Sequence, residues 1–301
     1  MGAKNYLIPD FRLSYSSGQT FLGCKRRFWH QKVNKTKFDP DYVENYDAFN
    51  IGKAFHEVLE ICKHDEEKYR PEYLTNACRN HNITDPREVG LILGMVSKYI
   101  KLHKESGLVS IGEELKISNP KYLGFVDVVM VDKEGGWWIV DLKTASKFNK
   151  SLVSRLAMDP QLNLYASFRG DIAEQLGIKV EDFKGVRYRV TTKTTIVLRQ
   201  GESPEDYAQR IQGKIMSADL AVPAMKLSPE KTYKLYMGIY DEMAEVFKSE
   251  EDEVPQNWNN CESFFRPCPY WSQCYNRTFT GNVDEEITVA SSDEIDFLTS
   301  L

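Results

Sequence analysis

The sequence predicts an α/β protein in which helices flank a central mixed β-sheet. Amphipathic helical patterns fill the first hundred residues, and alternating strand patterns follow at 110–118 and 121–131. Residues 124–143, GFVDVVMVDKEGGWWIVDLK, are typical of a β-hairpin whose turn is the glycine pair at 135 and 136. Helical patterns return after the hairpin, so helices are expected around the sheet.

Three helices are expected before the sheet. Residues 14–33 begin with a serine cap and continue with an apolar stripe that includes Phe21 and Phe28. Residues 50–64 form a second amphipathic pattern. A longer helix is expected to begin at the cap formed by Asp85 and the proline that follows it.

The sheet is expected to continue after a short helix. Residues 159–169 begin with an aspartate cap and a proline, and Gly170 is expected to end this helix. Residues 185–199 return to a strand pattern. Two later helices are expected to open with Ser-Pro-Glu, at Ser203 and Ser228.

Composition predicts a soluble globular protein. Of the 301 residues, 42% are hydrophobic and 28% are charged. No apolar run approaches the length of a membrane span, and the first ten residues lack the apolar core of a signal peptide. The expected location is therefore the cytoplasm, without a membrane partner.

Charge is unevenly distributed along the chain. The net charge is -5, and residues 281–301 contribute -6, so the rest of the chain carries +1. Such a body can still carry basic patches, and Lys25, Arg26 and Arg27 form the centre of one. These three residues are expected on the exposed side of their helix, as either a solvated face or a surface that binds phosphates.

A single domain is expected over residues 1–280. It would contain a helical part at about 40–108, a catalytic sheet core at about 109–200, and C-terminal helices with a cysteine segment at 201–280. Residues 281–301 are expected to be a disordered acidic tail that could dock on a protein partner.

The hairpin places charged side chains in an apolar setting. Because side chains alternate along a strand, Asp141 and Lys143 share one face, and Asp127 lies on the other strand of the hairpin. The residues before Asp141 make both faces of that strand apolar, so these charges are expected to be buried. Burial is costly unless the charges pair or bind a metal. The hairpin is therefore a candidate site, with a buried Asp-Lys salt bridge as the alternative.

Carboxylates on this hairpin suggest metal chemistry. Asp127 and Asp141, joined by Glu114 from the preceding strand, offer hard oxygen ligands that suit Mg²⁺ or Mn²⁺. Such a metal polarises a phosphodiester and lowers the pKa of a bound water. Lys143 could orient that water or offset charge on the phosphate. His56 lies beside the apolar stripe of its helix, where a histidine is more often structural unless carboxylates lie near it.

The order of these motifs resembles the RecB-type branch of the PD-(D/E)XK nuclease superfamily. The matching motifs are a helical His56, the GFVD that ends at Asp127, the DLK of 141–143, and the QxxxY of Gln161 and Tyr165, two residues that share a helix face. The likeness covers residues 14–275 and implies a restriction-endonuclease-like core.

The resemblance also implies a role for each matching residue. Metal ligands would be Asp127, Asp141, the carbonyl of Leu142, and His56. Lys143 would be the catalytic lysine. Gln161 and Tyr165 would hold the active site and the nucleic-acid backbone. Glu114 would be a further ligand, with its neighbour Glu113 as the alternative match.

Six cysteines fall into two groups. Cys62 and Cys78 lie in helical patterns and are expected in the core. The others resemble the cysteines of iron-sulfur members of this branch, which include AddB and CRISPR-associated adaptation nucleases: Cys24, Cys261, Cys268 and Cys274. The resemblance implies a [4Fe-4S] cluster that clips the two ends of the domain. Zinc is the alternative cofactor, and four unrelated thiols are the alternative to any cofactor.

The resemblance implies a Mg²⁺- or Mn²⁺-dependent DNA exonuclease that prefers single-stranded ends. Its setting would be recombination, repair or phage DNA processing, and a phage-encoded chain would work in the host cytoplasm. A catalytically silent DNA-binding or assembly module on the same fold is the alternative. A third hypothesis, a small-molecule metal enzyme, lacks the support of a glycine-rich phosphate loop.

Overall fold

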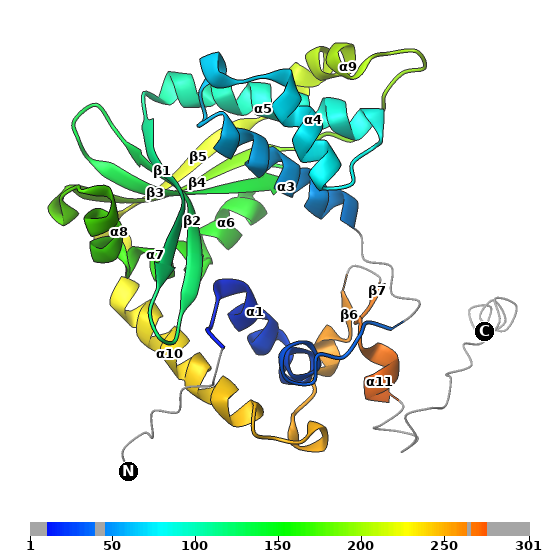
Figure 1. The fold of residues 1–301 in the computed structure, drawn as a ribbon, viewed down its shortest axis with the longest axis vertical. Coiled ribbons are helices and arrows are strands. Elements are labelled where there is room, and N and C mark those ends of the chain that lie inside the picture. The colour runs from blue at the N-terminus through cyan, green and yellow to red at the C-terminus, as the bar shows by residue number, and fades with distance from the viewer. Residues whose placement is uncertain (1–10, 40–45, 264–265, 276–301) are drawn as a thin grey trace, which may run out of the picture. The chain divides into compact units, whose positions relative to one another are not determined.

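A computed structural model describes residues 11–39, 46–263 and 266–275 (Figure 1). The predicted acidic tail at 281–301 lies outside the described residues. The chain divides into two compact units. One unit draws its described residues from 16–44 and 241–301, and the other from 9–15 and 45–240.

The larger unit contains the predicted mixed sheet, which is confirmed. Its strands lie in chain order: β1 (Val109–Ser118), β2 (Leu123–Val131), β3 (Trp137–Ala145), β4 (Phe183–Thr192) and β5 (Ser217–Pro223). Only β3 and β4 pair in parallel, and the other neighbours are antiparallel. The hairpin turn between β2 and β3 uses Gly135, whose φ of +85° favours glycine.

Helices cover both faces of this sheet. In Figure 1, α3, α4, α5 and α9 lie on one side, and α6, α7 and α8 lie on the other. Their bounds are α3 (Tyr46–Ile61), α4 (Pro71–Asn80), α5 (Pro86–Ser106), α6 (Lys150–Met158), α7 (Pro160–Ala166), α8 (Arg169–Leu176) and α9 (Pro204–Ile211). α10 (Pro229–Val246) begins in this unit and continues into the other.

The main hydrophobic core lies between one face of the sheet and α3, α4 and α5. Sheet residues such as Val128, Val140 and Leu142 pack there against the buried stripe of α3. Cys62 and Cys78 are buried in this core, as predicted. Asp85 caps α5 by accepting the backbone N–H of Arg87, which confirms the predicted start of that helix.

The smaller unit is built from short elements. Its helices are α1 (Tyr15–Gly23), α2 (Lys25–Phe28), a π-helix at Trp29–Val33 and α11 (Trp271–Tyr275), and β6 (Glu262–Ser263) pairs with β7 (Arg266–Pro267). The first residue of α1, Tyr15, is assigned to the other unit. Short 3-10 turns lie at Glu251–Glu253 and Trp258–Asn260.

The expected continuous helix over 14–33 is wrong. Cys24 is extended, with φ of -160°, and its sulfur accepts the backbone N–H of Arg27. The chain therefore starts a new helix at Lys25, because the cysteine acts as an N-cap. The expectation that Arg26 lies on the exposed side is also wrong: the side chain is buried, and its Nε donates to the carbonyl of Val254 at 2.7 Å.

Two other boundaries differ from the prediction. α7 ends at Ala166 and α8 begins at Arg169, so Gly170 lies inside a helix rather than ending one. The strand expected over 185–199 ends at Thr192. Among the described residues, no helix has the length and apolar character needed to cross a membrane.

Candidate active site

Strand pairing brings the two predicted aspartates together. Val128 on β2 pairs with Val140 on β3, so Asp127 and Asp141 lie opposite one another one residue further along the antiparallel strands. The Oδ2 atom of Asp127 accepts the backbone N–H of Leu142 at 2.7 Å. Asp141 is only 1% exposed. The end of the hairpin therefore fixes two neighbouring carboxylates in a mostly buried position.

Both carboxyl groups resist ionisation in this setting. Burial raises the pKa of Asp141 to about 7, and the charge of Asp127 adds to the effect. Burial also raises the pKa of Asp127, although the N–H of Leu142 opposes this. Two neighbouring buried carboxylates repel one another when both are ionised. A bound cation would relieve that repulsion.

Lys143 contacts both Asp141 and Gln161. Its Nζ is 2.8 Å from Oδ2 of Asp141 and donates to Oε1 of Gln161 at 2.9 Å. Burial opposes the charge of Lys143, but the carboxylates of Asp141 and Asp127 outweigh it, so the pKa lies above its usual value. The lysine is therefore cationic at neutral pH.

α7 supplies Gln161. The Nε2 of Gln161 donates to the hydroxyl of Tyr165 at 3.1 Å, one helical turn further along. Asp159 caps α7 by accepting the backbone N–H of Gln161, and it also accepts the hydroxyl of Tyr15 at 2.7 Å. The chain thus fixes the start of α7, and this fixes the glutamine against Lys143.

His56 approaches the carboxylates from α3. Its Nδ1 is 3.8 Å from Oδ2 of Asp127. Burial lowers the pKa of His56, and this effect outweighs the attraction of Asp141. The imidazole is therefore neutral at pH 7, which is the form that binds metals.

Glu114 joins this group, whereas Glu113 does not. Glu114 lines the same pocket as His56 and Lys143, and its φ of +45° breaks the regular course of β1 opposite Asp127. Glu114 is exposed as a residue, but its carboxyl is partly buried. This burial, together with the charge of Asp127, raises the pKa of Glu114 to about 7. Glu113 instead accepts the hydroxyl of Ser110 at 2.6 Å.

A pocket of about 640 Å³ opens onto these residues. It is bounded by α3 and by the end of β3, and its lining includes Phe49, Lys53, His56, Glu60, Glu114 and Lys143. The opening gives a ligand a route to Lys143, His56 and Glu114, whereas Asp127 and Asp141 do not line it.

The donor atoms fit a hard divalent cation in their chemistry. Oδ2 of Asp141 is buried, and although Lys143 lies near it, no donor in the described part of the chain makes a well-directed hydrogen bond to it. Two carboxylates, a neutral imidazole and the carbonyl of Leu142 are a typical oxygen-rich donor set. In the described residues, however, no three His, Cys, Asp or Glu side chains are already arranged to hold a metal ion.

The four cysteines of the implied cluster all lie in the smaller unit, although among the described residues no three of them are arranged to hold a metal ion. Cys261 precedes β6 and Cys268 follows β7, and the N–H of Cys268 donates to the carbonyl of Cys261 at 2.7 Å. Burial raises the pKa of the Cys274 thiol to about 12, and the charges of Cys268 and Cys24 add to it. Burial, followed by the charge of Cys24, also raises the pKa of Cys261. Burial likewise raises the pKa of Cys268, so the thiols of Cys261, Cys268 and Cys274 resist ionisation.

The three basic residues predicted to bind DNA belong to the smaller unit. Lys25 forms an ion pair with Glu242 at 2.8 Å, and Arg26 is buried. Arg27 is half-buried. The interaction of Lys25 and Arg27 with DNA stays a prediction, whereas Arg26 is held by the fold.

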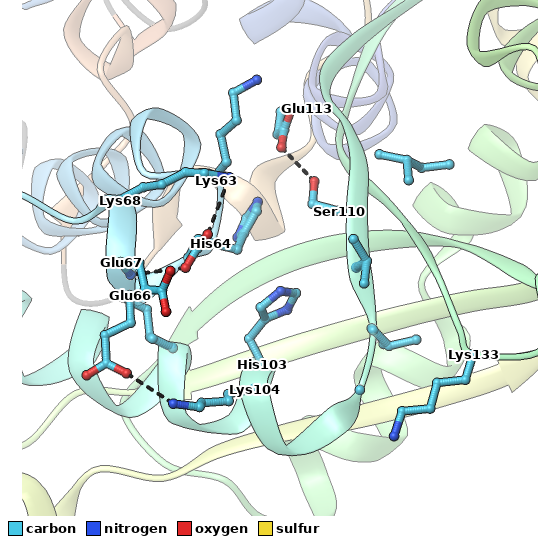
Figure 2. Close-up of a pocket in the computed structure, with 16 residues that line it drawn as sticks. Lys63, His64, Glu66, Glu67, Lys68, His103, Lys104, Ser110, Glu113 and Lys133 are labelled. Atoms are coloured by element: carbon cyan, nitrogen blue, oxygen red, sulfur yellow. Dashed lines mark hydrogen bonds and ion pairs between the residues drawn. The ribbon is translucent and has the colours of Figure 1, made fainter.

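The sequence patterns missed a second pocket in the larger unit, of about 580 Å³ (Figure 2). Its lining includes His64, which lies in the Lys63–Lys68 segment, and His103, which lies near the end of α5 (Figure 2). Behind them Arg189 is fully buried, donates to Nδ1 of His103 at 2.9 Å, and forms two bonds with Asp219 at 2.7 and 2.8 Å. The sequence feature that could have indicated this pocket is Arg189, a charged residue within the apolar pattern of β4.

Comparison with known proteins identifies the family of this arrangement. A family model described as the PD-(D/E)XK nuclease superfamily matches residues 12–275. A search of curated proteins found no match. The family match covers most of the chain and includes every residue of the hairpin site.

Proposed function

The chain belongs to the PD-(D/E)XK nuclease superfamily, and from this premise we propose that it is an exonuclease that degrades DNA from single-stranded ends. Membership implies a metal-dependent nuclease that hydrolyses phosphodiester bonds of DNA. The observation that best supports nuclease activity is the neighbouring pair Asp127 and Asp141, with Lys143 held beside them by Gln161. A structural salt bridge would need only one carboxylate, whereas here a second one is buried against it.

The proposed cofactor is Mg²⁺ or Mn²⁺, which superfamily members typically use. Asp127, Asp141, His56 and the Leu142 carbonyl would hold it, with Glu114 as a further ligand. The ion would supply Lewis-acid polarisation of the scissile phosphate and would activate the attacking water.

Lys143 has a defined task in this proposal. The neighbouring carboxylates raise its pKa, so the side chain is an ammonium at neutral pH. It can donate hydrogen bonds, so it would orient a water or stabilise the negative charge that develops on the phosphate. Gln161 keeps the ammonium at this position, and Tyr165 keeps the glutamine. Direct contact of Gln161 and Tyr165 with the nucleic-acid backbone is part of the proposal.

The proposed setting is recombination, repair or phage DNA processing in a cytoplasm, on the RecB-type iron-sulfur branch of the superfamily. Lys25 and Arg27 would contact DNA phosphates. The acidic tail would be available to a protein partner.

Four cysteines support a second part of the proposal, a [4Fe-4S] cluster with a structural role. Support comes from their common place in the smaller unit and from the β6–β7 hairpin, which joins Cys261 and Cys268 by a backbone hydrogen bond. Protein purified without oxygen should be brown, and Cys268→Ser should lose the visible absorbance. A colourless protein that contains zinc would show that the site binds zinc and not an iron-sulfur cluster. A protein that contains neither iron nor zinc would show that the four thiols are unrelated.

The proposed activity is tested by degradation of end-labelled single strands with Mg²⁺ or Mn²⁺. Asp141→Ala should fall to the background rate, because it removes a carboxylate that no neighbour replaces. Glu134→Ala is the matched control: it removes an exposed carboxylate from the turn of the same hairpin and should cleave like the wild type. Persistent cleavage by Asp141→Ala would sink the assignment. Retention of DNA by the wild type without cleavage under either metal would favour a silent binding module.

A further inference from the structure

One face of α3 points an aromatic side chain at the catalytic pocket. Phe49, Lys53, His56 and Glu60 follow one another at spacings of three or four residues, and all four line that pocket. They form one row along the helix. Phe49 therefore shares a helix face with the proposed metal ligand His56, two turns away.

Phe49 does not contribute to the hydrophobic core. The apolar stripe of α3, which includes Ile51, Phe55 and Val58, is almost completely buried. Phe49 lies off this stripe and is 60% exposed. An exposed aromatic residue is ordinary by itself, so its position at the mouth of the pocket is the informative observation.

Lys53 gives this aromatic ring a charged neighbour. Its Nζ lies 4.3 Å from the centre of the Phe49 ring, one helical turn further along α3. A cation over one face is attracted by the ring and orders it. With Lys53 on one face, the ring can offer its other face to a planar ligand.

α3 also approaches the catalytic strand closely. A Cβ placed on Gly52 would lie 3.4 Å from Oγ1 of Thr144, the residue that follows Lys143. The backbone of α3 therefore passes next to the end of β3, between Phe49 and His56. A nucleotide stacked on the Phe49 ring would therefore lie at the pocket that Lys143 also lines.

We propose that Phe49 and Lys53 form a nucleobase subsite for one unpaired nucleotide of the substrate strand. The base stacks on the Phe49 ring, and the ammonium of Lys53 attracts the phosphate of that nucleotide. The subsite requires a base with a free face, which paired and stacked bases of a duplex do not present. It rests on the proposed nuclease function and supplies a physical reason for a single-strand preference.

Single abasic residues test the subsite. A set of labelled strands carries one abasic residue at successive positions, and kcat/KM is measured for the wild type and Phe49→Ala. Stacking contributes about 1–3 kcal/mol per base, so Phe49→Ala should lose about 5- to 150-fold on the intact strand. On the strand whose abasic residue falls in the subsite, the wild type should lose a similar factor and Phe49→Ala should lose nothing more. Phe49→Trp should restore the intact-strand rate.

Leu235→Ala is the matched control, because Leu235 is also helical and is 59% exposed. It should cleave every strand like the wild type. Equal losses by Phe49→Ala on the intact strand and on every abasic strand would overturn the subsite, as would the absence of any loss.

Binding measurements separate failure of the subsite from failure of the nuclease proposal. Affinity for the same strands, measured by fluorescence anisotropy with EDTA, should show the same position-dependent pattern without any cleavage. A protein that binds with this pattern but never cleaves would keep the subsite and refute the nuclease. A protein that cleaves without the pattern would keep the nuclease and refute the subsite, and absence of DNA binding would refute both.

Discussion

Gln161 is the side chain whose removal should best separate positioning from folding. Gln161→Met keeps the length of a mostly buried side chain but removes both amide contacts. The lost acceptor served the Lys143 ammonium at 2.9 Å, and a hydrogen bond to a charged group contributes about 1.5–3 kcal/mol. If the bond acts fully in the transition state, kcat should fall by about 10- to 150-fold.

Tyr165→Phe provides the comparison within the same chain of contacts. It removes only the hydroxyl that accepts from Gln161 at 3.1 Å. A neutral bond contributes about 0.5–1.5 kcal/mol, so kcat should fall by about 2- to 10-fold. Because the tyrosine is argued to act through the glutamine, the double variant should be no slower than Gln161→Met alone.

Single-turnover cleavage at saturating metal is the appropriate assay, with unfolding midpoints recorded for each variant. Stable variants with the order given above would support positioning through Lys143. A larger loss in Tyr165→Phe than in Gln161→Met would refute this reasoning. Additive losses in the double variant would also refute it and would place Tyr165 in separate contact with the substrate.

Two further predictions concern stability, both measured by urea unfolding. Burial, with the nearby charge of His103, lowers the pKa of His64 to about 3, so below pH 6.5 the unfolded chain binds a proton that the folded chain excludes. The free energy of unfolding is therefore unaffected by His64 above the unfolded pKa and is lowered by about 2 kcal/mol at pH 5. His64→Gln should not show this decrease. The raised carboxyl pKa values elsewhere change stability equally in wild type and variant. An identical pH 7-to-5 change in wild type and variant would contradict the prediction. Arg189→Met should cost about 3 kcal/mol by leaving Asp219 without its main partner, and a change below about 1 kcal/mol would contradict that account.

Local patterns in the sequence predicted the parts of the fold that short-range physics determines. The hairpin around Gly135 and the cap of α5 at Asp85 follow from turn and capping chemistry. The side-chain alternation of β3 placed Asp141 and Lys143 on one face, and the structure adds the register that puts Asp127 opposite them. These residues were predictable as site residues because charged side chains are rare within an apolar strand.

Features that depend on distant contacts were not predictable in this way. β5 pairs at the edge of the sheet, and its side chains are half-buried or exposed, so it lacks a clear apolar alternation. Cys24 fits a helical pattern, but its extended backbone ends one helix and caps the next. Arg189 is buried because β5 supplies Asp219 and α5 supplies His103, two partners that lie far from it in the sequence.

Metal-linked stabilisation tests the central claim most directly. A ligand that binds only the folded chain stabilises it by about 2.7 kcal/mol at a concentration one hundred times its Kd. Adding Mn²⁺ should therefore raise the unfolding midpoint of the wild type and of Glu134→Ala by several degrees. Asp141→Ala should show no such rise. An equal rise in Asp141→Ala would contradict a metal site built on the hairpin carboxylates.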